Sequence, residues 1–107
     1  MGIDLILMTD FEKRFSDKEK LRRVLGEKEL VGKMESLAGR VAVKEALVKT
    51  GYLKVGEWLK VQIMNDELGA PYAIGQYGER IKGVTISIAH AGDYVTAVAI
   101  YEEDKNN

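Results

Sequence analysis

The chain has 107 residues, of which 46% are hydrophobic and 31% charged, so it is long enough for one folded domain and too short for two. Its 16 Lys and Arg residues nearly balance 17 Asp and Glu residues, which excludes a global basic field that would hold nucleic acid nonspecifically. With no Cys and a single His, a disulfide framework, a thiolate nucleophile and the usual Cys/His zinc sites are excluded, so any metal must rest mainly on oxygen ligands.

The N-terminal part of the chain predicts a strand and then a short helix. Residues 2–8 are mostly branched aliphatic side chains in a short run, which is typical of a buried strand. Ser16 stands three residues before Glu19, and this spacing predicts a capping box at the start of a highly charged helix. Gly26 is expected to end that helix.

The remainder of the chain predicts one long helix followed by strands. Over residues 29–49 apolar side chains recur at three, four or seven positions ahead of Gly51, a typical C-cap, which indicates the long helix. Strands are predicted at 59–63, 72–76, 84–90 and 94–101, with turns at 65–69 and 91–93 and a frayed tail at 102–107. This order predicts a single α+β domain over residues 1–107, with an N-terminal strand, a long helix and a mainly antiparallel sheet.

Two charged residues interrupt the apolar stripe of the long helix. The stripe continues onto Lys44 and Glu45, so charged groups lie at or beside the core face. One interpretation is an ordinary ion pair on the helix flank, in which Glu45 contacts Lys49, Arg40 or Lys44. The other interpretation is a functional carboxylate with a perturbed environment.

Asp4 raises the same question in the first strand. A carboxylate within a buried strand is costly unless a backbone N–H, a lysine or a cation lies nearby. If Asp4 and Glu45 meet, their repulsion calls for a cation between them, and magnesium prefers such oxygen ligands. Nearby lysines would then indicate a metal-assisted phosphate site, although the spacing alone does not show that the two carboxylates touch.

The only histidine, His90, lies at the end of a predicted strand. A structural role and a ligand contact are both open for it. A nucleophilic triad of Ser87, His90 and Asp93 is excluded, because residues three apart on a strand point to opposite faces.

Four blocks of the chain together resemble one known family. They are residues 2–5 (Gly-Ile-Asp-Leu), 37–49 (Leu-Ala-Gly-Arg-Val-Ala-Val-Lys-Glu-Ala-Leu-Val-Lys), 65–71 (Asn-Asp-Glu-Leu-Gly-Ala-Pro) and 86–90 (Ile-Ser-Ile-Ala-His). In this order they resemble holo-acyl-carrier-protein synthase, the small bacterial type of 4′-phosphopantetheinyl transferase. The resemblance covers most of the chain, and the second block is its most specific part.

The resemblance implies a reaction and a set of site residues. The phosphopantetheine arm of coenzyme A would pass to a serine of an acyl carrier protein in fatty acid biosynthesis, with adenosine 3′,5′-bisphosphate released. Asp4 and Glu45 would hold magnesium, Lys49 would reach the phosphates, and His90 would contact the 3′-phosphate. Either Glu45 or a water on the metal would take the serine proton. The other implied coenzyme A contacts are Arg40, Lys44, Gly69 and Pro71.

This sequence departs from the family pattern at two positions. Ala70 stands where the family often has lysine, which removes a charged contact beside the nucleotide, although Gly69 and Pro71 keep the turn. Ala89 replaces the second serine of the histidine block, a change of little consequence for His90.

The resemblance also implies two protein partners. The acyl carrier protein of this family presents an acidic helix, and Arg14, Lys18 and Arg22 would form one basic docking stripe at i,i+4 spacing if a helix runs through all three. A solvated charged face is the alternative. The second partner is the chain itself, since the family's small members form homotrimers with the site shared between neighbours.

Other classes of function remain open at this stage. A noncatalytic module that binds coenzyme A or a carrier protein would have no need of both carboxylates, and a structural oligomerisation domain would show no magnesium-dependent binding. No apolar run reaches the length of a bilayer span and the N-terminus lacks the pattern of a signal peptide, so we expect a cytoplasmic protein without membrane or nucleic-acid partners.

Overall fold

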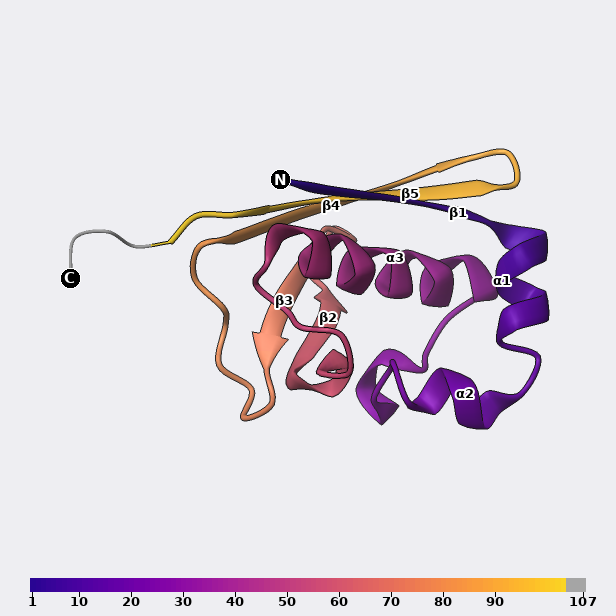
Figure 1. Ribbon diagram of the computed structural model, residues 1–107, viewed down its shortest axis with the longest axis horizontal. Coiled ribbons are helices and arrows are strands. Elements are labelled where there is room, and N and C mark those ends of the chain that lie inside the picture. Colours follow the sequence, from indigo (N-terminus) through magenta and orange to yellow (C-terminus); the bar gives the residue numbers. More distant parts are fainter. Residues whose placement is uncertain (104–107) are drawn as a thin grey trace.

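The computed structural model describes residues 1–103, and its elements confirm the predicted α+β class (Figure 1). The strands are β1 (Gly2–Leu7), β2 (Val61–Asn65), β3 (Pro71–Gly75), β4 (Val84–Ala91) and β5 (Tyr94–Tyr101). The α-helices are α1 (Met8–Arg14), α2 (Lys18–Arg22) and α3 (Met34–Thr50), and two 3₁₀ turns are η1 (Glu27–Glu29) and η2 (Trp58–Lys60). Among the described residues no helix is long and apolar enough to cross a membrane.

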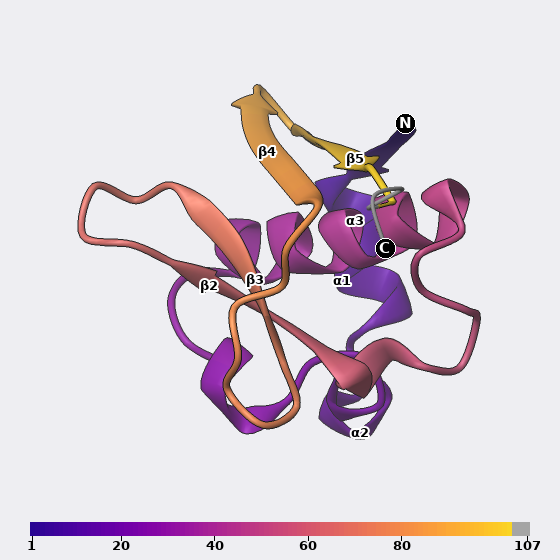
Figure 2. The same cartoon turned by 90° about the vertical axis from the view of Figure 1, so that its left-hand side faces the viewer.

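The long helix α3 lies between two layers. On one side it packs against an antiparallel sheet of order β1-β5-β4, which runs edge-on along the top of Figure 1. On its other side lie the β2–β3 hairpin and the short helix α2, as the turned view in Figure 2 also shows. Both hydrophobic cores include α3 side chains, so this helix is the common wall of the two layers.

The close packing of α3 on the sheet rests on small residues. Ala97 and Ala99 of β5 are fully or almost fully buried beneath the helix. A Cβ atom on Gly2 would lie 2.0 Å from the carbonyl oxygen of Ala46, so only glycine permits β1 to pass this near to α3. Strand alternation then turns Asp4 inward with Gly2, toward α3.

The N-terminal helices differ from the prediction. The strand ends at Leu7, and an unpredicted helix, α1, follows it directly. The capping box is wrong: the Asp17 carboxylate accepts the Glu19 N–H at 2.9 Å and caps α2, whereas the Ser16 hydroxyl donates to the carbonyl of Lys13. Asp17 prevails because its side chain reaches the free N–H of the first turn, while Ser16 is engaged by the end of α1.

The start of the long helix was predicted too early, and its end correctly. Gly32 has a φ of +91°, a left-handed conformation that interrupts the chain before α3 begins at Met34. At the other end Gly51 forms the expected left-handed C-cap, with φ of +86°. The later strands match their predicted positions to within one or two residues, and the expected frayed tail lies outside the described residues from position 104 onward.

Candidate active site

Strand β1 and helix α3 bring Asp4, Glu45 and Lys49 together. Lys49 Nζ donates to Asp4 Oδ1 at 3.2 Å and to the carbonyl of Ile3 at 2.7 Å. Glu45 lies one helical turn before Lys49, on the same side of α3. Lysine carries three N–H donors, so one remains available to a ligand at this exposed side chain.

The half-buried Glu45 carboxylate experiences opposing charges. Burial, and then the neighbouring Asp4 carboxylate, raise the pKa of Glu45, while the Arg14 guanidinium lowers it and only partly offsets the increase. Arg14 Nη1 lies 3.0 Å from Glu45 Oε1. The ion pairs expected of Glu45 along its own helix, with Lys49, Arg40 or Lys44, do not form, because those three side chains contact other groups.

The donor set at this point fits a hard divalent cation. Asp4 Oδ2 is buried and has no hydrogen-bond partner among the described residues, so one carboxylate oxygen is left for a ligand. No group of three or more His, Cys, Asp or Glu side chains gathers anywhere in residues 1–103. Two carboxylates with water and phosphate oxygens are the usual surroundings of magnesium, whereas a cage made only of protein ligands is not available here.

A second group of predicted site residues lines a separate cavity of about 410 Å³. His90, exposed at the end of β4, and Arg40 on α3 lie on its walls. The remaining lining residues include Gly69 and Pro71 of the β2–β3 turn and Asn65. Four of the residues that the resemblance implied as coenzyme A contacts therefore share one cavity.

Arg40 is held at this cavity by three hydrogen bonds. Its Nη1 donates to the carbonyls of Glu29 at 2.7 Å and Val31 at 2.6 Å, and its Nη2 donates to Asn65 Oδ1 at 3.2 Å. A guanidinium has five N–H donors, so two remain, one of them on the buried Nε. A fixed guanidinium with spare donors is suited to a phosphate oxygen.

The turn between β2 and β3 is built by Asn65 and Asp66. Asp66 Oδ1 accepts the N–H groups of Leu68 and Ala70, and Asn65 Nδ2 donates to the carbonyl of Gly69. Gly69 has a φ of +87°, so the turn requires glycine there. The alanine at position 70 offers no charge to the cavity, but the turn geometry does not depend on its side chain.

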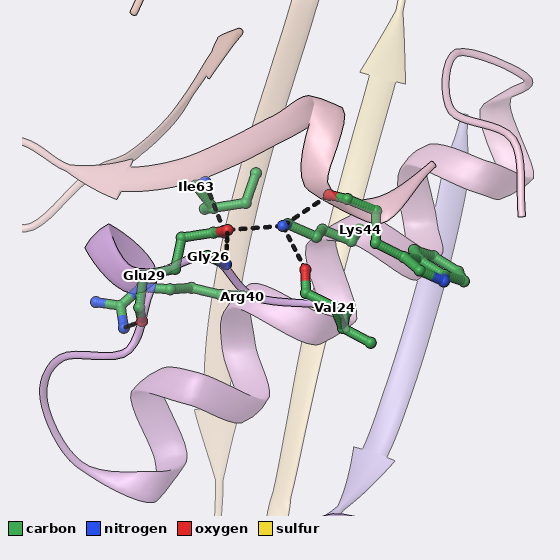
Figure 3. Close-up of polar contacts among 7 residues, drawn as sticks. Val24, Gly26, Glu29, Arg40, Lys44 and Ile63 are labelled. Atoms are coloured by element: carbon green, nitrogen blue, oxygen red, sulfur yellow. Dashed lines mark hydrogen bonds and ion pairs between the residues drawn. The ribbon is translucent and has the colours of Figure 1, made fainter. Parts of the chain in front are cut away.

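Lys44 is not a coenzyme A contact, contrary to the prediction from the resemblance. Its side chain is fully buried, and Nζ donates to Val24 O, Glu29 Oε1 and Trp58 O at 2.6, 2.7 and 2.8 Å (Figure 3). All three of its donors are therefore used inside the protein. The prediction was wrong because α3 turns Lys44 into the interior, where Val24, Glu29 and Trp58 take up its donors.

The predicted basic stripe is also broken. One helix does not connect Arg14 with Lys18, because α1 ends at Arg14 and α2 begins at Lys18. Arg14 pairs with Glu45, and Arg22 pairs with Glu19 at 2.7 Å. The three cations thus belong to two elements and make different contacts.

Sequence reasoning missed two residues of this region. Asn65 was part of a recognised block but was not assigned a role, and only the fold reveals that it holds Arg40. Glu29 is fully buried although it stands in the charged run Glu27-Lys28-Glu29, which carries no signal that distinguishes one acid from the other.

Comparison with known proteins identifies the family. No protein-family model matches the sequence. The chain is 35% identical over 114 residues to the holo-[acyl-carrier-protein] synthase of a Geobacillus species, covering 95% of this chain and 94% of that protein. It is 31% identical over 119 residues to the holo-[acyl-carrier-protein] synthase of Chloroherpeton thalassium, covering 98% of both.

Solved structures agree with these relatives. Helicobacter pylori holo-[acyl-carrier-protein] synthase, crystallised with coenzyme A, superimposes with a TM-score of 0.73 at 28% identity, covering 94% of this chain and 98% of that one. The Bacillus anthracis enzyme, in complex with CoA (3′,5′-ADP), also gives a TM-score of 0.73 at 28% identity, covering 95% of each chain. With relatives of this identity and coverage and a shared fold, the chain belongs to the holo-[acyl-carrier-protein] synthase family, as its sequence blocks predicted.

Proposed function

We propose that this protein transfers the 4′-phosphopantetheine group of coenzyme A to a serine hydroxyl of an apo acyl carrier protein, with adenosine 3′,5′-bisphosphate as the second product. The observation that carries the proposal is the meeting of Asp4, Glu45 and Lys49 across β1 and α3, in a chain whose relatives are named for this synthesis. We also propose a cytoplasmic site of action, since both substrates are highly polar.

The two groups of site residues divide the donor substrate between them. The Arg40 and His90 cavity receives the nucleotide end, where the 3′-phosphate can accept a hydrogen bond from the spare N–H of Arg40 Nη2. Lys49 directs its remaining N–H toward the pyrophosphate. Solved relatives in complex with coenzyme A support this donor substrate.

Magnesium is the cofactor that we propose for the Asp4 and Glu45 carboxylates. When bound, it would neutralise charge that develops on the pyrophosphate oxygens during transfer. The orphaned Asp4 Oδ2 and the all-oxygen donor set support this choice.

The chain's own groups orient the reacting atoms. The serine oxygen forms a bond to the pantetheine-side phosphorus, the bridging P–O bond breaks, and the bisphosphate leaves with the electron pair. The acceptor of the serine proton would be Glu45 or a water on the metal, and the raised pKa of Glu45 favours this carboxylate. Lys49 stabilises the phosphate charge throughout.

We propose a homotrimer in which neighbouring chains share the site. The outward face of the three-stranded sheet exposes apolar side chains on β1 and β5, with Ile3, Leu5 and Ile100 exposed at 52%, 63% and 38%. An apolar sheet face of this kind favours association. In addition, Glu45 and Arg40 line different cavities of one chain, and a neighbouring chain can bring the two halves of a site together.

We propose that the acyl carrier protein docks over α1 and α2. Lys18 and Arg22 lie on the rim of a groove of about 480 Å³ whose floor includes Phe15, Leu21 and Leu37. Two cations beside an apolar floor, with Glu12 as the one acidic lining residue, suit an acidic amphipathic helix. Arg14 and Arg22 already pair with Glu45 and Glu19, so Lys18 is the cation of the three whose charge has no ion-pair partner among residues 1–103.

Intact mass spectrometry tests the reaction. Apo acyl carrier protein incubated with this protein, coenzyme A and magnesium should gain the mass of one phosphopantetheine, and the gain should disappear with EDTA. Asp4→Asn and Glu45→Gln should each abolish the gain, while Glu27→Gln, which removes an exposed carboxylate outside the proposed site and docking residues, should keep it. Coenzyme A binding without any mass gain on several carriers would favour a noncatalytic binding module instead.

A further inference from the structure

A fully buried ion pair joins Glu29 and Lys44 outside both groups of site residues (Figure 3). Neither side chain has any exposed surface, and Lys44 Nζ lies 2.7 Å from Glu29 Oε1. Both carboxylate oxygens are engaged as well, because Oε1 also accepts the Gly26 N–H at 3.0 Å and Oε2 accepts the Ile63 N–H at 2.9 Å. The pair therefore binds no substrate, and its contacts are all internal.

Such a pair is weak evidence for stability. Removing two charges from water is costly, and well-packed apolar residues of similar volume often stabilise a fold as well or better. The pair does, however, fix the backbone around it. Its hydrogen bonds hold the main chain at Val24 and Gly26, at Trp58, and at Ile63 in β2. Three segments, namely the loop after α2, η2 and β2, are thereby held in one arrangement around α3.

Two of those segments carry the anchors of Arg40. The carbonyl of Glu29 itself accepts Arg40 Nη1 at 2.7 Å, so the residue whose side chain is locked by Lys44 also presents an acceptor to the guanidinium. The second anchor, Asn65, stands two residues beyond Ile63 on β2, the strand that Glu29 Oε2 holds. Fixing the Glu29 carboxylate thus fixes both sides of the Arg40 guanidinium.

We infer that Glu29, with Lys44, is a positioning residue that holds the Arg40 guanidinium preorganised for the 3′-phosphate of the nucleotide. This inference rests on the proposed function, because it takes the Arg40 and His90 cavity as the nucleotide end of the site. Three donors of this guanidinium are already bound to fixed acceptors, so the side chain loses little conformational entropy when a phosphate binds. Less of the free energy of the phosphate contact is therefore offset by ordering the side chain.

The test compares two nucleotides that differ only in the 3′-phosphate. Calorimetry gives the Kd of adenosine 5′-monophosphate and that of adenosine 3′,5′-bisphosphate, and the first divided by the second is the ratio that reports the 3′-phosphate contact separately from overall affinity. The double variant Glu29→Gln/Lys44→Met removes both buried charges together, which avoids an unpaired charge in the core. We expect it to lower the ratio by at least about fivefold, since small misplacement of a binding group has large effects.

Three further variants make the outcome unambiguous. Glu29→Asp keeps the charge but shortens the side chain, so it should lose the Ile63 contact and lower the ratio to a smaller extent, and it serves if the double variant does not fold. Leu47→Ala, a buried apolar change in the same helix at a residue whose side chain takes no part in these hydrogen bonds, should lower the melting temperature and leave the ratio unchanged. Arg40→Gln should lower the ratio most.

Each pattern of results decides a different question. A wild-type ratio in a folded Glu29 variant, with a lowered ratio in Arg40→Gln, would overturn the positioning role alone. A wild-type ratio in Arg40→Gln would instead remove Arg40 as a 3′-phosphate contact, whatever the Glu29 variants show, and the intact-mass assay would still decide the proposed transfer reaction. A ratio lowered equally by Leu47→Ala would mean that general loss of stability, and not the position of the guanidinium, controls nucleotide binding.

Discussion

Substituting alanine for Gly2 tests whether the close approach of β1 to α3 creates the active site. An added Cβ would lie 2.0 Å from the carbonyl oxygen of Ala46 and 3.1 Å from the Cβ of Lys49. The first neighbour is backbone in the middle of a helix and cannot turn aside. The strand must therefore withdraw by about 1 Å or more to restore an ordinary contact distance.

The cost of that withdrawal can be worked out for both stability and activity. Overpacking of this kind costs about 1–3 kcal/mol, and each kcal/mol lowers the melting temperature of a domain of this size by about 4–8 °C. Asp4 is two residues further along the same strand face, so it moves away from Glu45 and Lys49. Misplacement of a reacting group by about 1 Å costs about 10²-fold in rate, which is the expected loss of phosphopantetheine transfer.

Thermal unfolding and the intact-mass assay measure these two effects. Gly26→Ala is the matched control, because Gly26 has a φ of −76° and the nearest atom to an added Cβ is 3.9 Å away. That variant should keep both transfer and stability, within about 0.5 kcal/mol. A folded Gly2→Ala protein that transfers at the wild-type rate would show that the carboxylate pair does not depend on this approach.

Three other predictions concern charge and assembly. Because the folded pKa of Glu45 is raised, the folded chain holds that proton at a pH where the unfolded chain has released it, so ionised Glu45 destabilises the fold as pH rises. In EDTA, the melting temperature of Glu45→Gln should exceed that of the wild type at pH 7, and the difference should vanish in acid, where Glu45 is protonated. A difference in melting temperature that persists at low pH would contradict this account. Arg14→Gln removes a cation that competes for Glu45, so the affinity for Mn²⁺, followed by electron paramagnetic resonance, should rise about two- to fivefold, whereas Arg22→Gln, whose arginine has the same exposure, should leave it unchanged. Leu5→Glu places a charge on the outward sheet face and should give monomers by light scattering with reduced transfer, and a trimer with this variant would refute the proposed interface.

The sequence by itself determined the features that depend on neighbours along the chain. Alternating and continuous apolar runs located the strands, because side chains on a strand repeat every two residues. Gly51 marked the end of the long helix, because its left-handed conformation is open to glycine at little cost. The four blocks also identified the family, since they preserve residue types in order and do not require knowledge of contacts.

Only the tertiary structure decided which charged groups meet. Lys49 pairs with Asp4 from 45 positions away and Glu45 with Arg14 from 31, while the local partners that helix spacing suggested for Glu45 make other contacts. Lys44 and Glu29, 15 positions apart, form an interior pair for the same reason. Their burial places Lys44 in the core and not at coenzyme A. Spacing along a helix shows which side chains are neighbours on that helix, but the burial of a charge, and hence its partner, is set by the elements that pack over it.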